Sequence, residues 1–368
     1  LAMSFYQELQ LDAVGFKSLI KESKNKKEKA SHIAIFIFKV LLNTLFCILL
    51  VTAFSAVFKD ENRMVGVIIT ISILQFRLVD LQLKKSHAVL SLAIVFIILM
   101  FGPHLANLVQ NLMLLPGNLS ALAALPIHLV CIFGIVIFGC HNINLYNQFV
   151  FVLGYLLLYG YDVTGKLYIL RVACIGVGAL IVISIYCIKQ RKRTCERTLK
   201  NIFKEFNIRS VRTSWQIKIT LAVATILVFT KLIGAERGMW AGIATMSVIV
   251  PNLNDIPKRS INRCMGNIAG SVLFALMYTV FPDYIKSFIG VIGGIGNGFC
   301  SQYRWQAMFN SLGAMAMGVT FFGAMDVSIW SRLFNNVIGA VYGILFGLLF
   351  HRIAALIIKK NSIKNVIN

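Results

Sequence analysis

Long apolar runs, separated by short clusters of Lys and Arg, alternate along almost the whole sequence. Runs such as Ala88–Leu105 and Leu119–Phe138 contain no Asp, Glu, Lys or Arg, and each has about the 20 residues that a helix needs to cross a bilayer. Only 14% of the 368 residues are charged, whereas soluble domains average about 25%. The sequence predicts an all-α polytopic membrane protein without a soluble domain of any size.

The net charge of +22 raises the question of a nucleic-acid partner. The cations lie between the apolar runs, which is where cytoplasmic loops of membrane proteins carry them. We therefore expect the lipid bilayer and no nucleic acid as a partner. The eight cysteines lie mostly inside apolar runs without a CxxC or another metal-ligand spacing, and no P-loop or GxSxG motif occurs. The sequence thus predicts no metal site, no cofactor and no enzyme.

The runs predict about 12 transmembrane helices in two sets of six. Residues 1–32 form an amphipathic and basic segment, residues 33–188 the first six spans, residues 189–214 a basic cytoplasmic linker, residues 215–358 the second six spans, and residues 359–368 a tail. The first six spans are Ile33–Phe58, Met64–Phe76, Ala88–Leu105, Leu119–Phe138, Gln148–Tyr159 and Leu167–Ile188. The second six are Trp215–Ile233, Gly238–Val250, Cys264–Phe281, Tyr284–Cys300, Trp305–Phe322 and Ser331–Ile358. We expect the uncharged stretch Ala106–Gly117 to be a half-buried interfacial loop.

Twelve spans place both termini and the linker on one side of the membrane. Lys and Arg are far more numerous in the loops of that side, so it is predicted to be cytoplasmic. Because each half has an even number of spans, the two halves are expected to share one orientation, related by a pseudo-twofold axis along the membrane normal.

The two halves also share an order of polar residues, which suggests an internal duplication. At an offset of 175 positions, Thr70 matches Thr245, Ser72 matches Ser247, Asp80 matches Asp255 and Glu61 matches Glu236. Further along, the offset becomes 161, and Arg171-x6-Gly178-Ala179 matches Arg332-x6-Gly339-Ala340. The alternative is a chance similarity between apolar helices.

The second span of each half is too short to cross the bilayer. The run that begins at Met239 is stopped by Pro251, and about 13 residues of helix cover only about 20 Å of a 30 Å hydrocarbon core. Paired short helices at matching positions indicate the substrate site of a transporter, because a helix end at mid-depth exposes backbone groups. The hydroxyls nearby belong to Thr70, Ser72, Thr245 and Ser247. Alternatively, these small residues only permit close helix packing.

Two acids follow the short spans, in segments rich in Lys and Arg. Asp80 and Asp255 are candidates for carrying a coupling proton if they are removed from water. The alternative is that each acid pairs with its basic neighbours and stabilises the segment that follows the short span. Glu61 and Glu236 lie just before the short spans, at the opposite ends from Asp80 and Asp255. The same two roles, proton coupling or ion pairing, are open for them.

Arginines near membrane depth indicate an anionic substrate. Arg263, Gly266 and Gly270 share one helix face, where the glycines allow a neighbouring helix to approach. Arg171 and Arg332 each precede a glycine by seven residues, so they are also expected on a helix face that a neighbouring helix approaches. A guanidinium matches a carboxylate in bidentate geometry. Arginines near the ends of spans can also reach out to the membrane surface instead.

Met239-Trp240-Ala241, followed by Thr245, Pro251 and Arg263-x2-Gly266-x3-Gly270, resembles the signature of the fusaric acid resistance/aromatic acid exporter (FUSC) superfamily. This match covers about 35 residues, and the plan of two six-span repeats covers most of the chain. The resemblance implies export of aromatic or other organic acids across a bacterial inner membrane, driven by the proton gradient. Trp240 then joins the hydroxyls and arginines as a substrate-binding candidate.

The first repeat departs from this signature, since Val65 replaces the Trp, Phe76 the Pro, and Ala88 occupies the position of Arg263. The large cytoplasmic domain of many longer relatives is replaced by the basic linker. Two alternatives therefore remain beside a small-anion exporter: an anion channel related to the aluminium-activated malate transporters, and a membrane subunit of an envelope assembly without flux of its own. A homo-oligomer and a periplasmic adaptor are left open.

Overall fold

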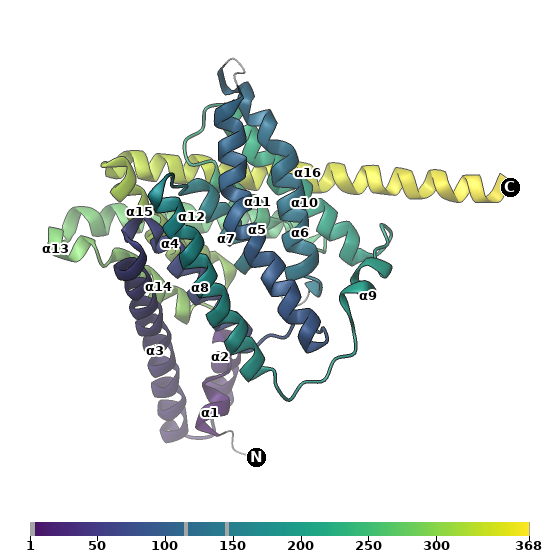
Figure 1. Ribbon diagram of the computed structural model, residues 1–368. Helices are drawn as coiled ribbons and strands as arrows, with labels where there is room; N and C mark the ends of the chain where they lie inside the picture. Colours follow the sequence, from purple (N-terminus) through teal and green to yellow (C-terminus); the bar gives the residue numbers. More distant parts are fainter. Residues whose placement is uncertain (1–3, 114–116, 144–146, 368) are drawn as a thin grey trace. The chain divides into compact units, whose positions relative to one another are not determined.

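The computed structural model describes residues 4–113, 117–143 and 147–367, and every regular element in these ranges is a helix (Figure 1). Seven helical segments are long and apolar enough to cross a membrane. They are Lys26–Phe58, Lys85–Leu112, Asn118–Gly139, Lys166–Lys189, Val211–Leu232, Asp255–Val280 and Met325–Ile353. The chain is a multi-pass membrane protein of the all-α class. Each of the 12 predicted spans overlaps a helix, but that all of them cross the bilayer stays a prediction.

The helices fall into a long and a short class. The long ones are α3 (Lys26–Phe58), α5 (Lys85–Leu112), α6 (Ala121–Gly139), α8 (Lys166–Lys189), α10 (Val211–Leu232), α12 (Asp255–Val280), α15 (Tyr303–Phe322) and α16 (Met325–Ile367). The shorter apolar ones are α4 (Arg63–Phe76), α7 (Gln148–Gly160), α11 (Met239–Val248) and α14 (Ile289–Phe299). Small elements complete the chain: α1 (Phe5–Glu8), α2 (Ala13–Glu22), η1 (Asp60–Asn62), η2 (Gly117–Ser120), α9 (Leu199–Lys204) and α13 (Asp283–Lys286).

Several boundaries differ from the sequence prediction. The predicted span Tyr284–Cys300 is divided into α13 and α14, and α16 begins at Met325 rather than Ser331. The predicted loop Ala106–Gly117 is wrong over most of its length, because α5 continues to Leu112. Ala106 and Gln110, four residues apart, lie on the buried face of this helix and extend its packing. Residues 114–116 lie outside the described part. Helix α12 begins at Asp255 rather than near Cys264, because Pro257 falls in its first turn, where proline is tolerated.

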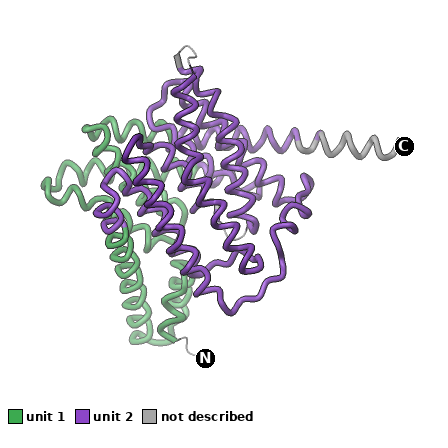
Figure 2. Tube along the Cα trace, in the orientation of Figure 1, with its two compact units in different colours: residues 1–50, 261–336 green, residues 51–260, 337–368 purple. Residues whose placement is uncertain are grey.

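The chain divides into two compact units (Figure 2). Unit 1 comprises residues 1–50 and 261–336. Its core joins α12, α14 and α15 through Phe274, Ile289 and Leu312. A second cluster forms where Phe16 of α2 stacks on Phe36 of α3, with a ring–centroid distance of 4.7 Å.

Unit 2 comprises residues 51–260 and 337–368, and its interior contains three short helices. Helix α7 contacts both α4 and α11, while α5, α6, α8 and α10 pack around them. Nine of the ten residues of α11 are buried. At 1.5 Å per residue, α11 is about 15 Å long and α4 about 21 Å, so neither reaches across a 30 Å core. The predicted shortness of both second spans is confirmed.

Helix α16 lies against α11 at a glycine. A Cβ atom on Gly339 would lie only 2.4 Å from the carbonyl oxygen of Ala241 and 2.7 Å from the Cβ of Ala244. Thr245 Oγ1 donates to the Gly339 carbonyl oxygen over 3.0 Å at the same contact. Only a residue without a side chain permits this approach of two backbones.

Helix α3 has the least buried apolar segment of the seven, with 11% of its most apolar window inside the structure. Its packing is confined to a few positions. Phe36 and Val40 join the cluster around Phe16, and Val51 and Phe54 lie against Gly66 of α4.

The basic linker, residues 189–214, is attached to the rest of unit 2 at two points, and the first is a carboxylate. Glu205 accepts hydrogen bonds from Arg197 Nη2 and Arg212 Nη1, each over 3.0 Å, and lies 3.4 Å from His141 Nε2. Burial raises the pKa of Glu205, but the hydrogen bond from Arg212 and the charges of Arg197, His141 and Arg212 lower it by more. Burial, Arg212 and Arg197 lower the pKa of His141 to about 4. A second attachment is the bond from Lys84 N to the Arg197 carbonyl oxygen, over 2.7 Å. The linker is thus a fixed element that contains α9.

The α11–α16 contact predicts that Gly339→Ala destabilises the protein. The added methyl group would overlap the Ala241 carbonyl, and forced overpacking of this kind costs about 1–3 kcal/mol. Thermal unfolding of the purified protein in detergent measures the loss. Gly294→Ala is the matched control, because a Cβ there has no atom within 4 Å. Equal melting temperatures for the two variants would contradict this contact.

The linker attachment predicts a loss of stability in mild acid. In the unfolded chain His141 titrates near its ordinary value of 6.5, whereas in the folded protein its pKa is about 4. The unfolded state therefore binds more protons between these values, and stability falls as the pH decreases from about 6.5 towards 4. Unfolding temperatures at pH 7 and pH 5 should differ for the wild type and less for His141→Gln. An unchanged pH dependence in that variant would rule out His141 as its source.

Candidate functional site

The four hydroxyls predicted near the substrate are buried, and each donates to a backbone carbonyl. In α4, Thr70 bonds to Gly66 over 2.7 Å and Ser72 to Ile68 over 2.8 Å. Ser247 of α11 bonds to Ala244 over 2.8 Å. Thr245 alone donates to another helix, at the Gly339 contact. These bonds satisfy the hydroxyl protons inside the protein and leave the oxygen atoms as acceptors.

The end of α11 is closed by side chains from two neighbouring helices. Arg259 Nε, in α12, donates to the Ser247 carbonyl oxygen over 2.6 Å. From α10, Trp215 Nε1 donates to Ile249 and Lys218 Nζ to Val250, each over 3.3 Å. The expectation that this helix end offers unpaired carbonyls is therefore wrong for these three groups. A buried carbonyl without a donor costs about 1–3 kcal/mol, which explains why polar side chains occupy an apolar environment here.

Two cations thus lie at the carboxyl end of α11. Lys218 is buried in the middle of an apolar helix, and no carboxylate pairs with it among the residues that the structure describes. The partial negative charge at the end of a helix favours Lys and Arg at this position. Lys218 and Arg259 are consequently accounted for by the backbone they contact. The roles of Trp215 and Arg259 were not predicted from the sequence, because Trp215 lies 36 residues before Pro251 and only packing brings it to this helix end.

In unit 1, Arg263 lies in a buried polar network. Its Nε donates to Asn336 Oδ1 over 3.0 Å and its Nη1 to the Tyr303 hydroxyl over 3.1 Å. Asn267, one turn further along α12, donates to the Arg263 carbonyl oxygen and accepts a 2.6 Å hydrogen bond from Ser311. All of these partners are neutral. Within the described chain no carboxylate pairs with Arg263.

The approach of α12 to α15 depends on the two glycines that follow Arg263. A Cβ on Gly266 would lie 2.4 Å from the Arg304 carbonyl oxygen, and one on Gly270 would lie 2.5 Å from that of Met308. The predicted close approach of a neighbouring helix is confirmed. It brings Tyr303 within reach of Arg263, a partner that the sequence pattern did not reveal.

Arg171 and Arg332 differ from Arg263 in their surroundings. Arg171 donates to Asn62 Oδ1 over 2.9 Å and to the Glu61 carbonyl oxygen over 3.1 Å, and lies 3.9 Å from Asp162. It joins α8 to the turn before α4 and has an acidic neighbour. Arg332 is buried, and its carbonyl oxygen accepts a 2.8 Å hydrogen bond from Asn336, the residue that accepts from Arg263.

The two candidate coupling acids lie in different environments. Asp80 is buried and accepts from the Tyr186 hydroxyl over 2.6 Å and from Cys195 Sγ over 3.6 Å. The predicted ion pairs with its basic neighbours do not form in the part of the chain described here. Burial and the charge of Asp80 raise the pKa of Cys195. Asp255 is exposed and accepts from Asn252 over 2.9 Å.

The remaining candidates differ in their burial. Trp240 is buried in α11, whereas the side chains of Glu61 and Glu236 are exposed. No cluster of His, Cys, Asp and Glu suited to a metal ion occurs among residues 4–113, 117–143 and 147–367. The structure therefore brings Arg263 and Arg332 together through Asn336 in unit 1. In unit 2 it places Thr245, Ser247 and Trp240 on α11 and, separately, Asp80 beside Tyr186.

Comparison with known proteins supports the signature seen in the sequence. Residues 221–346 match the family model described as Fusaric acid resistance protein-like. This segment contains Trp240, Thr245, Ser247, Asp255, Arg263 and Arg332. Neither the curated proteins nor the solved structures gave a significant match. Residues 221–346, which carry the predicted signature, are therefore similar to the fusaric acid resistance protein-like family.

Proposed function

We propose that this protein exports small organic anions, such as aromatic carboxylic acids, across a bacterial inner membrane, driven by the proton gradient. The observation that carries the proposal is the buried guanidinium of Arg263, whose hydrogen-bond partners are neutral. A charge at membrane depth is costly, and such residues mark pathways for substrates or ions. Arg263 therefore supplies the positive charge that a carboxylate substrate requires.

The geometry around Arg263 fits this role. Asn336 and Tyr303 hold Nε and Nη1 in fixed positions, and neither partner reduces the positive charge. A carboxylate that pairs with the guanidinium would compensate the charge only while the substrate is bound. The positive charge of Arg171 does not depend on a substrate for compensation, because Asp162 already lies beside it.

Asp80 is the better of the two candidates for proton coupling. Its carboxylate is buried among neutral donors, so taking up a proton changes the net charge of a closed site. Asp255 is exposed to solvent, and protonation there has little effect on its surroundings. We assign the coupling role to Asp80, with Tyr186 as the group that positions it.

One contact occurs in both halves of the chain and supports the proposed internal duplication. The matching of candidate residues between the two halves depends on this duplication. A Cβ on Gly178 of α8 would lie 2.4 Å from Ile69 of α4, just as Gly339 of α16 lies against Ala244 of α11. Ile69 and Ala244 are 175 positions apart, and Gly178 and Gly339 are 161 apart, which are the two offsets found in the sequence. These two contacts support a common arrangement of the second and sixth predicted spans in each half.

Uptake into proteoliposomes tests the proposal. We expect aromatic acids to accumulate against their gradient when a pH gradient is imposed, and accumulation to stop with a protonophore. Arg263→Gln should lower this transport about tenfold or more, because the charge that pairs with the carboxylate is lost. Arg263→Lys should retain part of it, since the charge remains without the planar donor pair.

Tyr303→Phe is the matched control, because it removes one hydrogen bond to Arg263 and leaves the charge in place. If it lowers transport as much as Arg263→Gln, the network rather than the charge is responsible. If chloride and organic anions only flow down their gradients and do not accumulate, the protein is an anion channel and not an exporter. No flux of any substrate would favour the subunit of an envelope assembly.

A second prediction concerns coupling. Asp80→Asn should abolish accumulation driven by the pH gradient and preserve exchange of labelled for unlabelled substrate, because exchange needs no net proton movement. Asp255→Asn, with the same change in charge at an exposed site, should leave both activities within about twofold. Accumulation by Asp80→Asn at the rate of the wild type would exclude Asp80 as the coupling group.

A further inference from the structure

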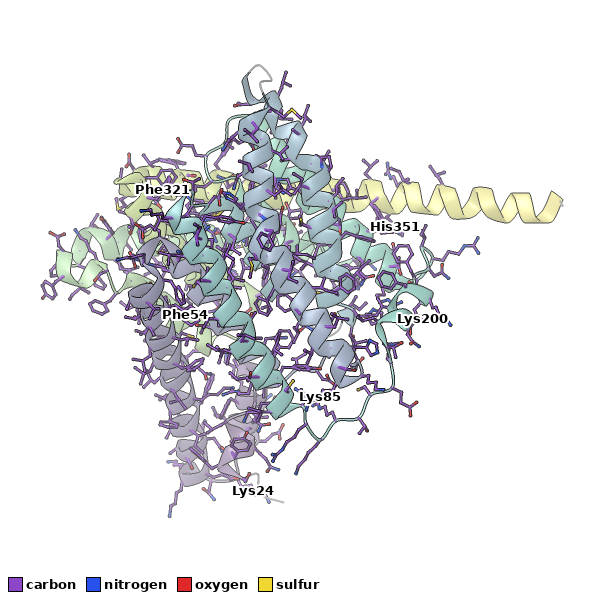
Figure 3. The ribbon with its side chains drawn as sticks, in the orientation of Figure 1. Lys24, Phe54, Lys85, Lys200, Phe321 and His351 are labelled. Atoms are coloured by element: carbon purple, nitrogen blue, oxygen red, sulfur yellow. The ribbon has the colours of Figure 1, made fainter. Side chains whose placement is uncertain are left out.

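The linker between α8 and α10 carries an exposed surface that combines apolar and cationic side chains. Phe203, Ile208 and Val211 are 58%, 67% and 65% exposed, and Phe206 is also exposed. The cations of this stretch, Lys200, Lys204 and Arg209, are exposed as well (Figure 3 labels Lys200, on α9). We call these seven residues the linker patch.

The linker patch is held in place by groups that face the protein. Ile202 is buried, and Glu205, the only acid between residues 199 and 211, pairs with Arg197 and Arg212. Thr198 and Asn201 close the start of α9 with a capping box. The inward side of this segment is therefore satisfied, and the charges that it presents outwards are all positive.

The two phenylalanines fix the depth of the linker patch along a spanning helix. The ring of Phe203 lies edge-on to Phe138 with centroids 5.9 Å apart, and that of Phe206 lies edge-on to Phe133 at 6.1 Å. Phe138 is the penultimate residue of α6, and Phe133 lies about 7.5 Å further in, at 1.5 Å per residue. Interfacial segments bury their apolar side chains to about 5–10 Å below the headgroups.

We propose that the linker patch lies in the membrane interface and binds the headgroups of anionic phospholipids. Its apolar side chains continue the lipid-facing flank of α6, and its three cations lie at the level where the phosphates of the bilayer begin. Clusters of Lys and Arg beside spanning helices are attracted to anionic leaflets, with an affinity gain of about fivefold for each cation. The exposed aromatic and aliphatic groups distinguish this surface from one that binds a soluble anion.

Native mass spectrometry of the full-length protein tests the headgroup preference. With equal amounts of phosphatidylglycerol and phosphatidylcholine, the wild type should retain phosphatidylglycerol selectively. The triple variant Lys200→Gln, Lys204→Gln, Arg209→Gln should bind phosphatidylglycerol on the order of a hundredfold more weakly. The matched control Lys24→Gln, Lys26→Gln, Lys27→Gln removes the same charge from exposed lysines outside the linker patch and should bind it as the wild type does.

Hydrogen exchange in nanodiscs tests the location. Amides of residues 199–211 should exchange about tenfold more slowly in discs that contain phosphatidylglycerol than in pure phosphatidylcholine, and Phe203→Ser with Phe206→Ser should reduce this protection. Equal retention of both lipids by the wild type would overturn the proposal. So would wild-type binding by the triple variant, or protection of residues 199–211 by inorganic phosphate alone, which would assign the cations to a soluble anion.

Discussion

The structure of unit 2 depends on which groups donate hydrogen bonds to the carbonyls at the end of a buried ten-residue helix. Helix α11 stops where apolar side chains surround it, so its last carbonyls cannot reach water. Arg259, Trp215 and Lys218 donate to Ser247, Ile249 and Val250 in its place. This requirement explains a tryptophan and two cations in positions where an apolar residue would otherwise be expected. It also ties α10 and the start of α12 to the same short segment.

The buried cations of this chain have two kinds of partner. Around α11 and Arg171, cations contact carbonyl oxygens or an acid, and their role is to join helices. Around Arg263 the partners are an amide and a phenol, so the positive charge is positioned and not compensated. Arg171 and Arg263 are not counterparts in the predicted repeat, in which Ala88 occupies the position of Arg263. Their unlike surroundings agree with the departure of the first half from the family signature.

Much of the helical plan follows from the sequence, because apolar runs and their basic boundaries fix spans to within a few residues. The error at Ala106–Gly117 arose where polar residues such as Asn107 and Gln110 interrupt an apolar run without ending the helix. The short spans and the close approach at Gly266 and Gly270 were also predictable from spacing. The partners of Arg263 were not, since Tyr303 and Asn336 are 40 and 73 residues away and only packing brings them together. For the same reason Asp80 was expected to pair with nearby cations, whereas Tyr186 reaches it from 106 residues away.

Helix α3 shows where the sequence of such a protein is free to drift. Only 11% of its most apolar window is buried, and lipid tails accept any apolar residue of similar size. The buried side chains of α3 are those of His32, Phe36, Val40 and Phe54. Relatives should therefore differ more along α3 than along the buried α11, with these four positions as the slowly changing exceptions.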